Sequence, residues 1–347
     1  MRPLLLSLWI LMGAGTPQPC YPDKSNLLLL RSGDGSLTPI RTIAQWRQRR
    51  AHILANMQLV MGPLPDPSRK VPLDVQVLEE VRTPRYTRRK LTYLAEKGDR
   101  VPAYLLVPHK PGRHPAVLCL HQTTKPGKAE PVGLAGDPSL HYAHKLAEQG
   151  FVTLAPDYPN YGDYRCDPYA LGYASATMKG IWNHMRAVDL LISSPEVDAQ
   201  RIGVMGHSLG GHNSLFVATF DERIRCIVSN CGFCSFPTYY LGNLAGWSHQ
   251  GYMPRIRTTY GLRPDRVPFD FPELVAVLAP RPFLAIAPEK DHNFAVAGVQ
   301  DCIKAAAPVY ALLGHGDQLA AFYPQAGHAF TPEAWARTLG WLERALK

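Results

Sequence analysis

The chain has few cysteines for its length and no repeated or low-complexity segment, and both absences exclude classes of protein. Seven cysteines among 347 residues do not make the disulfide framework of a small secreted domain. Cys231 and Cys234 have CxxC spacing, but no second CxxC is present to complete a zinc site. We expect this pair, buried or bridged, to shape a loop. The absence of repeats excludes a solenoid or propeller architecture.

Positive charge is in excess, but it is not gathered into a stripe. The net charge is +9, and the basic residues are scattered through residues 41–50, 82–100 and 255–266. We interpret them as a solvated surface and expect no nucleic-acid partner, while an acidic polymer stays open as a substrate or neighbour. The length allows one large α/β domain or two small ones.

The N-terminal residues 1–19 have the pattern of a signal peptide. One positive charge precedes a short apolar core, and small residues follow near Gly15, where we expect cleavage. The apolar run is too short for a membrane span, and Cys20 follows a proline, unlike a lipoprotein cysteine. We therefore predict an exported protein, periplasmic or secreted, without a membrane anchor in the mature chain. The alternative is a hydrophobic arm on a cytosolic protein.

The remaining pattern predicts an α/β fold with a mostly parallel sheet. Residues 20–88 form an N-terminal extension containing an amphipathic helix at 40–61. A hairpin of strands at 89–96 and 101–107 follows, and then strands alternate with helices that cover both faces of the sheet. The further predicted strands are residues 116–120, 151–155, 201–205, 224–229, 282–287 and 320–323. The predicted helices are residues 140–149, 174–192, 209–220, 296–312 and 332–346.

One segment, residues 232–271, breaks this alternation. It is rich in Tyr, Trp, Arg, Pro and Gly and has no clear period, which is typical of a functional insertion. We predict a cap-like insertion beside the active site. Trp247 and Tyr252 within it, and Tyr158 at a strand end, are candidate substrate-binding residues. Alternatively, the aromatic side chains of the insertion only pack the loop down, and Tyr158 anchors the loop that follows its strand.

The most informative motif is Gly206-His207-Ser208-Leu209-Gly210. An apolar run precedes it and a proline-free helical segment follows, which is the strand, turn and helix of a GxSxG nucleophile elbow. The glycines permit strained backbone angles and close strand–helix contact. Ser208 then projects at the N-terminus of a helix, where backbone N–H groups can receive an oxyanion.

A serine nucleophile needs a histidine base, and the histidine needs an acid to orient it. In the hydrolases that use this elbow, the order along the chain is Ser, then Asp or Glu, then His. Asp291 follows the strand at 282–287, with Glu289 as a competing acid. His328 lies on a glycine-containing loop between the last strand and the terminal helix. The predicted triad is Ser208, His328 and Asp291.

The oxyanion hole should combine two backbone N–H groups. One belongs to Leu209, the residue after the nucleophile, and we assign the other to Gln122, on the loop after the strand at 116–120. No HGGG motif is present at that loop. This chemistry needs neither a metal nor a cofactor.

Several motifs together resemble a known family. They are His121-Gln-Thr123 with Gly133-Leu-Ala-Gly136, Leu154-Ala-Pro-Asp-Tyr-Pro159, the GHSLG elbow, Ala279-Pro-Arg-Pro-Phe283 and Gly327-His328. From about Leu91 onward the chain resembles dienelactone-hydrolase-like and acetyl-xylan-esterase-like α/β-hydrolases, which are close to the catalytic domain of prolyl oligopeptidases. The resemblance implies an α/β-hydrolase catalytic domain at residues 89–347 and hydrolysis of carboxylic esters, often on polysaccharides, without a cofactor.

Two departures refine this expectation. Dienelactone hydrolases proper use cysteine where this chain has Ser208, and nothing upstream of Leu91 is long or repetitive enough for the propeller of a prolyl oligopeptidase. We therefore predict a serine esterase acting on a small-molecule or polysaccharide ester, such as acetylated xylan. The alternatives are a serine oligopeptidase or aminopeptidase, and a catalytically silent glycan-binding protein of the same fold.

Overall fold

The computed structural model describes residues 20–347. The predicted signal peptide, residues 1–19, lies outside the described residues. Across the described part of the chain, no helix combines the length and apolar character that crossing a membrane requires.

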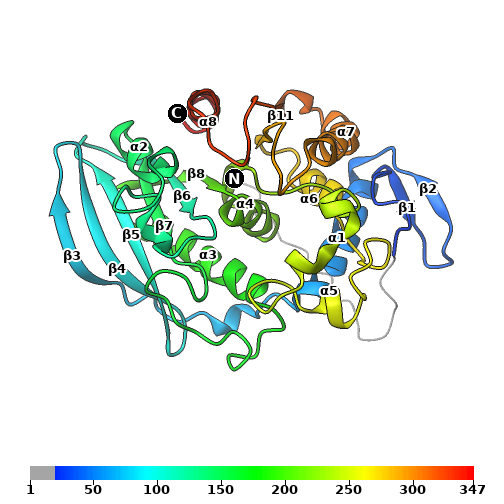
Figure 1. The fold of residues 1–347 in the computed structure, drawn as a ribbon, viewed down its shortest axis with the longest axis horizontal. Helices are drawn as coiled ribbons and strands as arrows, with labels where there is room; N and C mark the ends of the chain where they lie inside the picture. The colour runs from blue at the N-terminus through cyan, green and yellow to red at the C-terminus, as the bar shows by residue number, and fades with distance from the viewer. Residues whose placement is uncertain (1–19) are drawn as a thin grey trace, which may run out of the picture.

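The core of the molecule is a nine-stranded sheet (Figure 1). Its strands are β3 (Gln76–Arg82), β4 (Tyr86–Glu96), β5 (Asp99–Pro108), β6 (His114–Leu120), β7 (Val152–Pro156), β8 (Val197–His207), β9 (Ile224–Asn230), β10 (Phe283–Ile286) and β11 (Leu319–Phe322). The spatial order is β11-β10-β9-β8-β6-β7-β5-β4-β3. All pairs from β7 to β11 are parallel, whereas β3, β4 and β5 add an antiparallel edge. The predicted mostly parallel sheet is confirmed.

Helices cover both faces of this sheet, which is why its central strands are apolar on both sides. The helices are α1 (Ile43–Met61), α2 (Tyr142–Glu148), α3 (Ala176–Ser193), α4 (Leu209–Phe220), α5 (Arg255–Thr258), α6 (Phe271–Val277), α7 (Val296–Leu312) and α8 (Pro332–Leu346). On β8, Val204 joins the core cluster under α3 and α4, and the next residue, Met205, joins the cluster under α2 and α8. Both side chains are fully buried.

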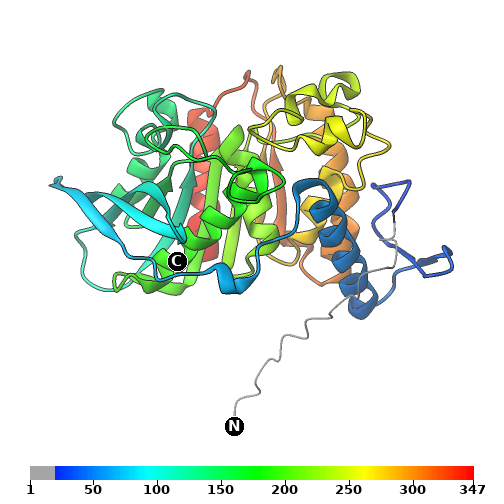
Figure 2. The same ribbon diagram turned by 90° about the horizontal axis from the view of Figure 1, so that it is seen from below.

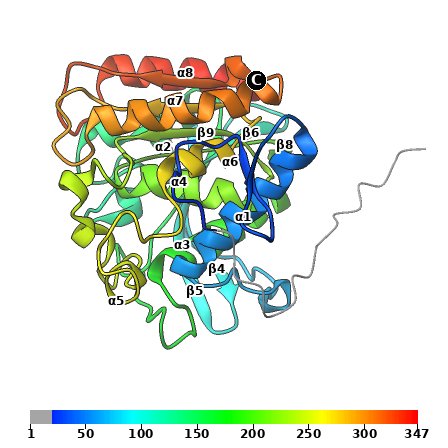
Figure 3. The same cartoon turned by 90° about the vertical axis from the view of Figure 1, so that its right-hand side faces the viewer.

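The N-terminal extension packs against the side of the sheet domain. It contains the hairpin β1 (Leu29–Arg31) and β2 (Leu37–Pro39), followed by α1. Thr42 and Gln45 form a capping box at the start of α1. Figure 3 shows α1 beside α6, where Arg49 of α1 donates to Glu273 at 2.6 Å in a fully buried ion pair. The helix begins at Ile43 rather than at residue 40, because the cap lies at Thr42.

At the antiparallel edge of the sheet, the structure corrects the predicted end of the N-terminal extension and the predicted start of the hairpin. β3 lies within the segment that the sequence assigned to the extension, and β4 begins at Tyr86, before residue 89. β3 escapes recognition because nearly all of its residues are exposed, Glu79 and Glu80 among them, so it has no apolar alternation. Charged side chains are common on such edge strands, where they discourage pairing with other chains.

The predicted insertion, residues 232–271, is irregular in the structure. It holds two short 3₁₀ turns, Tyr239–Gly242 and Leu244–Trp247, and the single-turn helix α5, and it ends where α6 begins at Phe271. Figure 2 shows this segment, in yellow-green, on the same side of the molecule as the loop that leads into α8. The chain thus places the insertion along the edge of the sheet where the candidate site lies.

Candidate active site

Four parallel strands end side by side and gather the candidate residues. His207 at the end of β8 pairs with Asn230 of β9, Asn230 pairs with Ile286 of β10, and Ile286 pairs with Phe322 of β11. Because the carboxyl ends are in register, the residues that follow them share one edge of the sheet. The segments after these ends carry, in order, Ser208, Cys231, Asp291 and His328.

Ser208 occupies the strained turn that the GxSxG pattern predicts. Its φ is 53° and its ψ is −114°, and its N–H donates to the carbonyl of Asn230 at 2.9 Å. The glycines are required by close backbone approach. A Cβ on Gly210 would lie 1.8 Å from the carbonyl oxygen of Leu120, and one on Gly206 would lie 2.4 Å from the carbonyl of Gly210. The turn therefore presents Ser208, half-buried, between β8 and α4.

His328 and Asp291 form a direct pair. The Nδ1 atom of His328 lies 2.9 Å from Oδ2 and 3.0 Å from Oδ1 of Asp291. Oδ1 also accepts the backbone N–H groups of Asn293 at 2.8 Å and Phe294 at 3.2 Å. Burial alone would raise the pKa of Asp291, but the hydrogen bond and the charge of His328, with the two N–H donors, lower it below its usual value. An ionised carboxylate only accepts, so Nδ1 carries the ring proton of neutral His328.

Glu289, the competing acid, is exposed and forms no hydrogen bond or ion pair with His328, so Asp291 and not Glu289 is the carboxylate that meets His328. The Nε2 atom of His328 is buried and has no hydrogen-bond partner among residues 20–347, the Ser208 hydroxyl included. The ring of His328 lies 4.8 Å from that of His207, next to the nucleophile in sequence. Such a base and nucleophile commonly tighten their contact only when substrate is bound.

The two expected oxyanion donors follow the ends of the neighbouring strands β8 and β6. Leu209 is the first residue of α4, so its N–H has no acceptor within the helix. Gln122 follows β6, and its side-chain amide is bonded to Glu130 at 3.1 Å. The backbone N–H of Gln122 is thus the group that fits the predicted oxyanion hole, because its side-chain amide is occupied by Glu130.

His121 holds the Gln122 loop in place, a function that the sequence motif did not reveal. Its Nε2 accepts the N–H of Tyr158 at 2.9 Å, so Nδ1 carries the proton and donates to the carbonyl of Gln122 at 2.6 Å. Burial lowers the pKa of His121, which keeps the ring neutral. The motif marks the position of His121, but its partner Tyr158 comes from another strand end.

Two of the three predicted substrate-binding residues are corrected by their burial. Tyr158 is 2% exposed, and its hydroxyl donates to the carbonyl of Gly251 at 3.0 Å, which fastens the insertion to the end of β7. Trp247 is also 2% exposed and packs among aromatic rings. Both support the wall of the site from within. Tyr252 is only partly buried, and its hydroxyl lies 3.3 Å from that of Thr123, next to Gln122.

The other two histidines near Ser208 support the elbow. The Nδ1 of His207 lies 2.5 Å from the amide nitrogen of Asn230 and accepts its proton. His212 lies on α4 and contacts the rings of Trp247 and Tyr252. Burial lowers the pKa of both His207 and His212 to about 3, so both stay neutral near pH 7. His207 thus supports the turn as a neutral ring.

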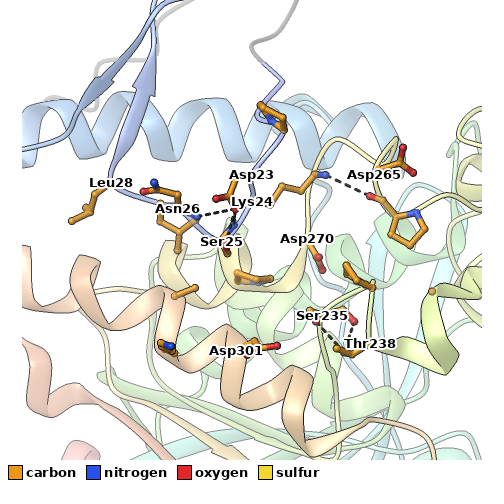
Figure 4. A pocket seen from close by; sticks show the side chains of 18 of the residues that line it. Asp23, Lys24, Ser25, Asn26, Leu28, Ser235, Thr238, Asp265, Asp270 and Asp301 are labelled. Carbon is orange, nitrogen blue, oxygen red and sulfur yellow. Dashed lines mark hydrogen bonds between the residues drawn. The ribbon is translucent and has the colours of Figure 1, made fainter.

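A hollow of about 1060 Å³ lies away from these residues, between the N-terminal segment, the insertion and α7 (Figure 4). Its polar groups bond mostly to one another. The hydroxyl of Ser25 donates to Asp23 at 2.6 Å, and Lys24 donates to the carbonyl of Pro264 at 3.5 Å. No member of the predicted triad lines it. The hollow therefore lies at the interface between the N-terminal extension and the α/β domain.

The mostly parallel sheet, the strand–turn–helix elbow and the loops that follow β10 and β11 define an α/β-hydrolase. A family model described as "Prolyl oligopeptidase family" matches residues 139–347, more than half of the chain. The chain belongs to the prolyl oligopeptidase family, whose catalytic domain is close to the hydrolases that its motifs resemble.

The individual relatives share low sequence identity with this chain. It is 26% identical over 282 residues to a protein named putative hydrolase YtaP from Bacillus subtilis. The matched region spans 78% of this chain and 90% of that protein. The chain is 27% identical over 202 residues to acetyl esterase Axe7A from Xylanibacter ruminicola, covering 52% of this chain and 44% of that one. A solved glucuronoyl esterase from Solibacter usitatus shares the fold with a TM-score of 0.76 at 19% identity, covering 95% and 99% of the two chains.

Proposed function

We propose that the protein is a serine hydrolase that cleaves carboxylic esters through an acyl-enzyme. The observation that carries the proposal is the His328–Asp291 pair on the loops beside the Ser208 elbow. The Ser208 hydroxyl attacks the ester carbonyl while Nε2 of His328 accepts its proton. The N–H groups of Leu209 and Gln122 stabilise the oxyanion. His328 then protonates the leaving alcohol, and a water molecule activated by the same ring releases the acid.

The carboxylate of Asp291 has two functions in this cycle. It holds the ring proton on Nδ1, which leaves the lone pair of Nε2 for the serine proton. Its negative charge also stabilises the imidazolium that forms during each transfer. The lowered pKa of Asp291 keeps its carboxylate ionised near pH 7.

Support for esters, and for carbohydrate esters in particular, comes from three directions. The relatives and structural neighbours include proteins named acetyl esterase and glucuronoyl esterase. Tyr252 and the exposed ring of His249, centroids 4.2 Å apart, form an aromatic surface of the kind on which sugar rings stack. Export by the predicted signal peptide would bring the enzyme to extracellular polysaccharide. We therefore propose that it deacylates or de-esterifies a carbohydrate such as acetylated xylan.

Peptide hydrolysis is the second candidate, and the family match is the observation that favours it. The two are separated by comparing p-nitrophenyl acetate, acetylated xylan and an alkyl glucuronate ester with an aminoacyl p-nitroanilide. Faster turnover of the anilide than of every ester would favour the peptidase.

The test of the nucleophile is Ser208→Ala with Ser193→Ala as the matched control. Ser193 is exposed at the end of α3. We expect Ser208→Ala to lose at least about 10³-fold in kcat on p-nitrophenyl acetate. Ser193→Ala should keep the wild-type rate. Comparable rates in folded Ser208→Ala and wild type would refute the proposed mechanism.

A further inference from the structure

A buried thiol, Cys231, lies beside the predicted acid and base of the triad. Cys231 follows β9, between the elbow strand β8 and the acid strand β10, and its N–H donates to Ile286 at 2.9 Å. The Sγ of Cys231, a carboxylate oxygen of Asp291 and a ring nitrogen of His328 all lie within 4.8 Å of one another. The proposed reaction uses no thiol, and Cys231 is in no disulfide.

We propose that Cys231, Asp291 and His328 bind a thiophilic divalent cation such as Zn²⁺ or Cd²⁺, which switches the hydrolase off. Thiolate, imidazole and carboxylate are the donors that Zn²⁺ takes in proteins, commonly three from the chain with a fourth position for water. Bonds of about 2.0–2.3 Å place any two ligand atoms less than about 4.6 Å apart. The three donors therefore need only a small adjustment to close around an ion.

The charges and protons of the site balance on binding. The thiol loses its proton to solvent, and the thiolate with the Asp291 carboxylate neutralises the two positive charges of the ion. The ion takes the lone pair at Nδ1 of His328, so the ring proton moves from Nδ1 to Nε2. One proton leaves the protein for each ion bound, and nothing is oxidised or reduced.

Inhibition follows from the position of the ring proton. With Nε2 protonated, His328 is a donor toward Ser208 and cannot accept the serine proton. The ion leaves the Ser208 hydroxyl and the oxyanion N–H groups untouched, so inhibition should lower kcat more than it raises KM. Only 12% of the His328 side chain and 1% of the Asp291 side chain are exposed, so onset should be slow. Binding itself does not depend on the proposed function, whereas the inhibition rests on it.

The first experiment measures binding without any substrate. In full-length protein carrying Cys20→Ser, which removes the exposed thiol, Cd²⁺ is titrated while the thiolate-to-cadmium charge-transfer absorption is followed. We expect one Cd²⁺ and one released proton per chain. Cys231→Ala should abolish the absorption and weaken affinity at least about tenfold, the lower limit for even outer partners of a metal site. Cys234→Ala, which removes the other cysteine of the CxxC pair, should bind like the parent.

The second experiment measures turnover of p-nitrophenyl acetate. Zn²⁺ should inhibit the Cys20→Ser parent slowly, a chelator should restore the rate, and Mg²⁺ at equal concentration should have no effect. Cys231→Ala should need at least about tenfold more Zn²⁺ for the same inhibition.

Cadmium absorption that survives in Cys231→Ala, or equal Zn²⁺ sensitivity with and without the thiol, would overturn the proposal. If Cys231→Ala does not fold, His328→Gln supplies the test, since it keeps the thiol and should still weaken Cd²⁺ binding at least about tenfold. If no ester is hydrolysed at all, the proposed function fails while the cadmium titration still decides the metal site.

Discussion

Replacing Asp291 by asparagine removes one charge and keeps the shape of the side chain, and the hydrogen bonds of the site dictate how the new amide must lie. Oδ1 of Asp291 accepts the N–H groups of Asn293 and Phe294 at 2.8 and 3.2 Å. The amide oxygen of the variant has to stay there, because an NH₂ group would face two donors. The NH₂ group therefore takes the place of Oδ2, 2.9 Å from Nδ1 of His328.

That arrangement reverses the polarity of the acid–base contact. An NH₂ donor at the shorter of the two contacts with Nδ1 favours the tautomer of His328 with its lone pair on Nδ1 and its proton on Nε2, in which the ring cannot accept the Ser208 proton. The loss of the same charge from a serine triad costs about 10⁴ in kcat, or about 5.5 kcal/mol of transition-state stabilisation. We expect Asp291→Asn to lose about 10⁴-fold in kcat, with a much smaller change in KM.

The assay is p-nitrophenyl acetate hydrolysis by wild type, Asp291→Asn and Glu289→Gln, with thermal melts to establish that each is folded. Glu289 is the exposed carboxylate two residues away and is the matched control, which should keep its activity. An Asp291→Asn enzyme within tenfold of the wild type would refute the tautomer argument. An equal loss in Glu289→Gln would show that the charge of the loop matters rather than the contact with His328.

Two further predictions concern Gly210 of the elbow and the buried carboxyl group of Asp270. Gly210→Ala should yield little soluble protein, or a folded protein without activity, because its Cβ would lie 1.8 Å from the carbonyl oxygen of Leu120; expression and turnover equal to wild type would contradict this packing. Burial raises the pKa of Asp270 to about 7, so the native state retains a proton that the unfolded chain releases near pH 3.8. This stability is fully present below pH 3.8 and is lost as the pH rises through about 7. Asp270→Asn keeps an oxygen for the N–H groups of Phe236 and Phe271 but cannot ionise. Between pH 3.8 and about 7 its melting temperature should therefore fall less than that of the wild type. Parallel plots of melting temperature against pH for the two proteins would show that Asp270 does not titrate in this range.

Much of the fold was predictable because its signals are local. The helices α4, α7 and α8 begin and end where the sequence predicted, at residues 209–220, 296–312 and 332–346. At α8 the reason is visible: Thr331 caps the helix and Pro332 occupies its first turn. The elbow is equally local, since Gly206 and Gly210 are fixed by contacts within one strand–turn–helix unit and the adjoining strand.

The errors occur where a residue's environment comes from elsewhere in the chain. Tyr158 and Trp247 were candidates to face a ligand, but they face inward, which agrees with the alternative that they anchor and pack the loops. Aromatic composition marks a loop that needs packing as readily as one that binds sugar, and only the folded contacts separate Tyr252 from its neighbours. His121 illustrates the converse, because its function depends on Tyr158 N–H, a partner 37 positions along the chain.

The order of the strands explains why Asp291 and His328 meet, and why the sequence did not show that Cys231 lies beside them. The strands β8, β9, β10 and β11 are adjacent and consecutive, so the loops that carry nucleophile, acid and base follow one another in space as they do in the chain. Chain order therefore indicated which loops would meet, and the Asp291–His328 pair agrees with that expectation. The same order inserts the end of β9 between the elbow and the acid loop, so whatever residue follows β9 must lie against the triad. The CxxC spacing marks Cys231 but does not reveal this position, and in our proposal its side chain decides which ions the acid and base bind. The thiol at Cys231 adds a soft donor to a carboxylate and an imidazole that any such triad already brings together, and this is why we expect metal sensitivity to depend on residue 231 rather than on the triad alone.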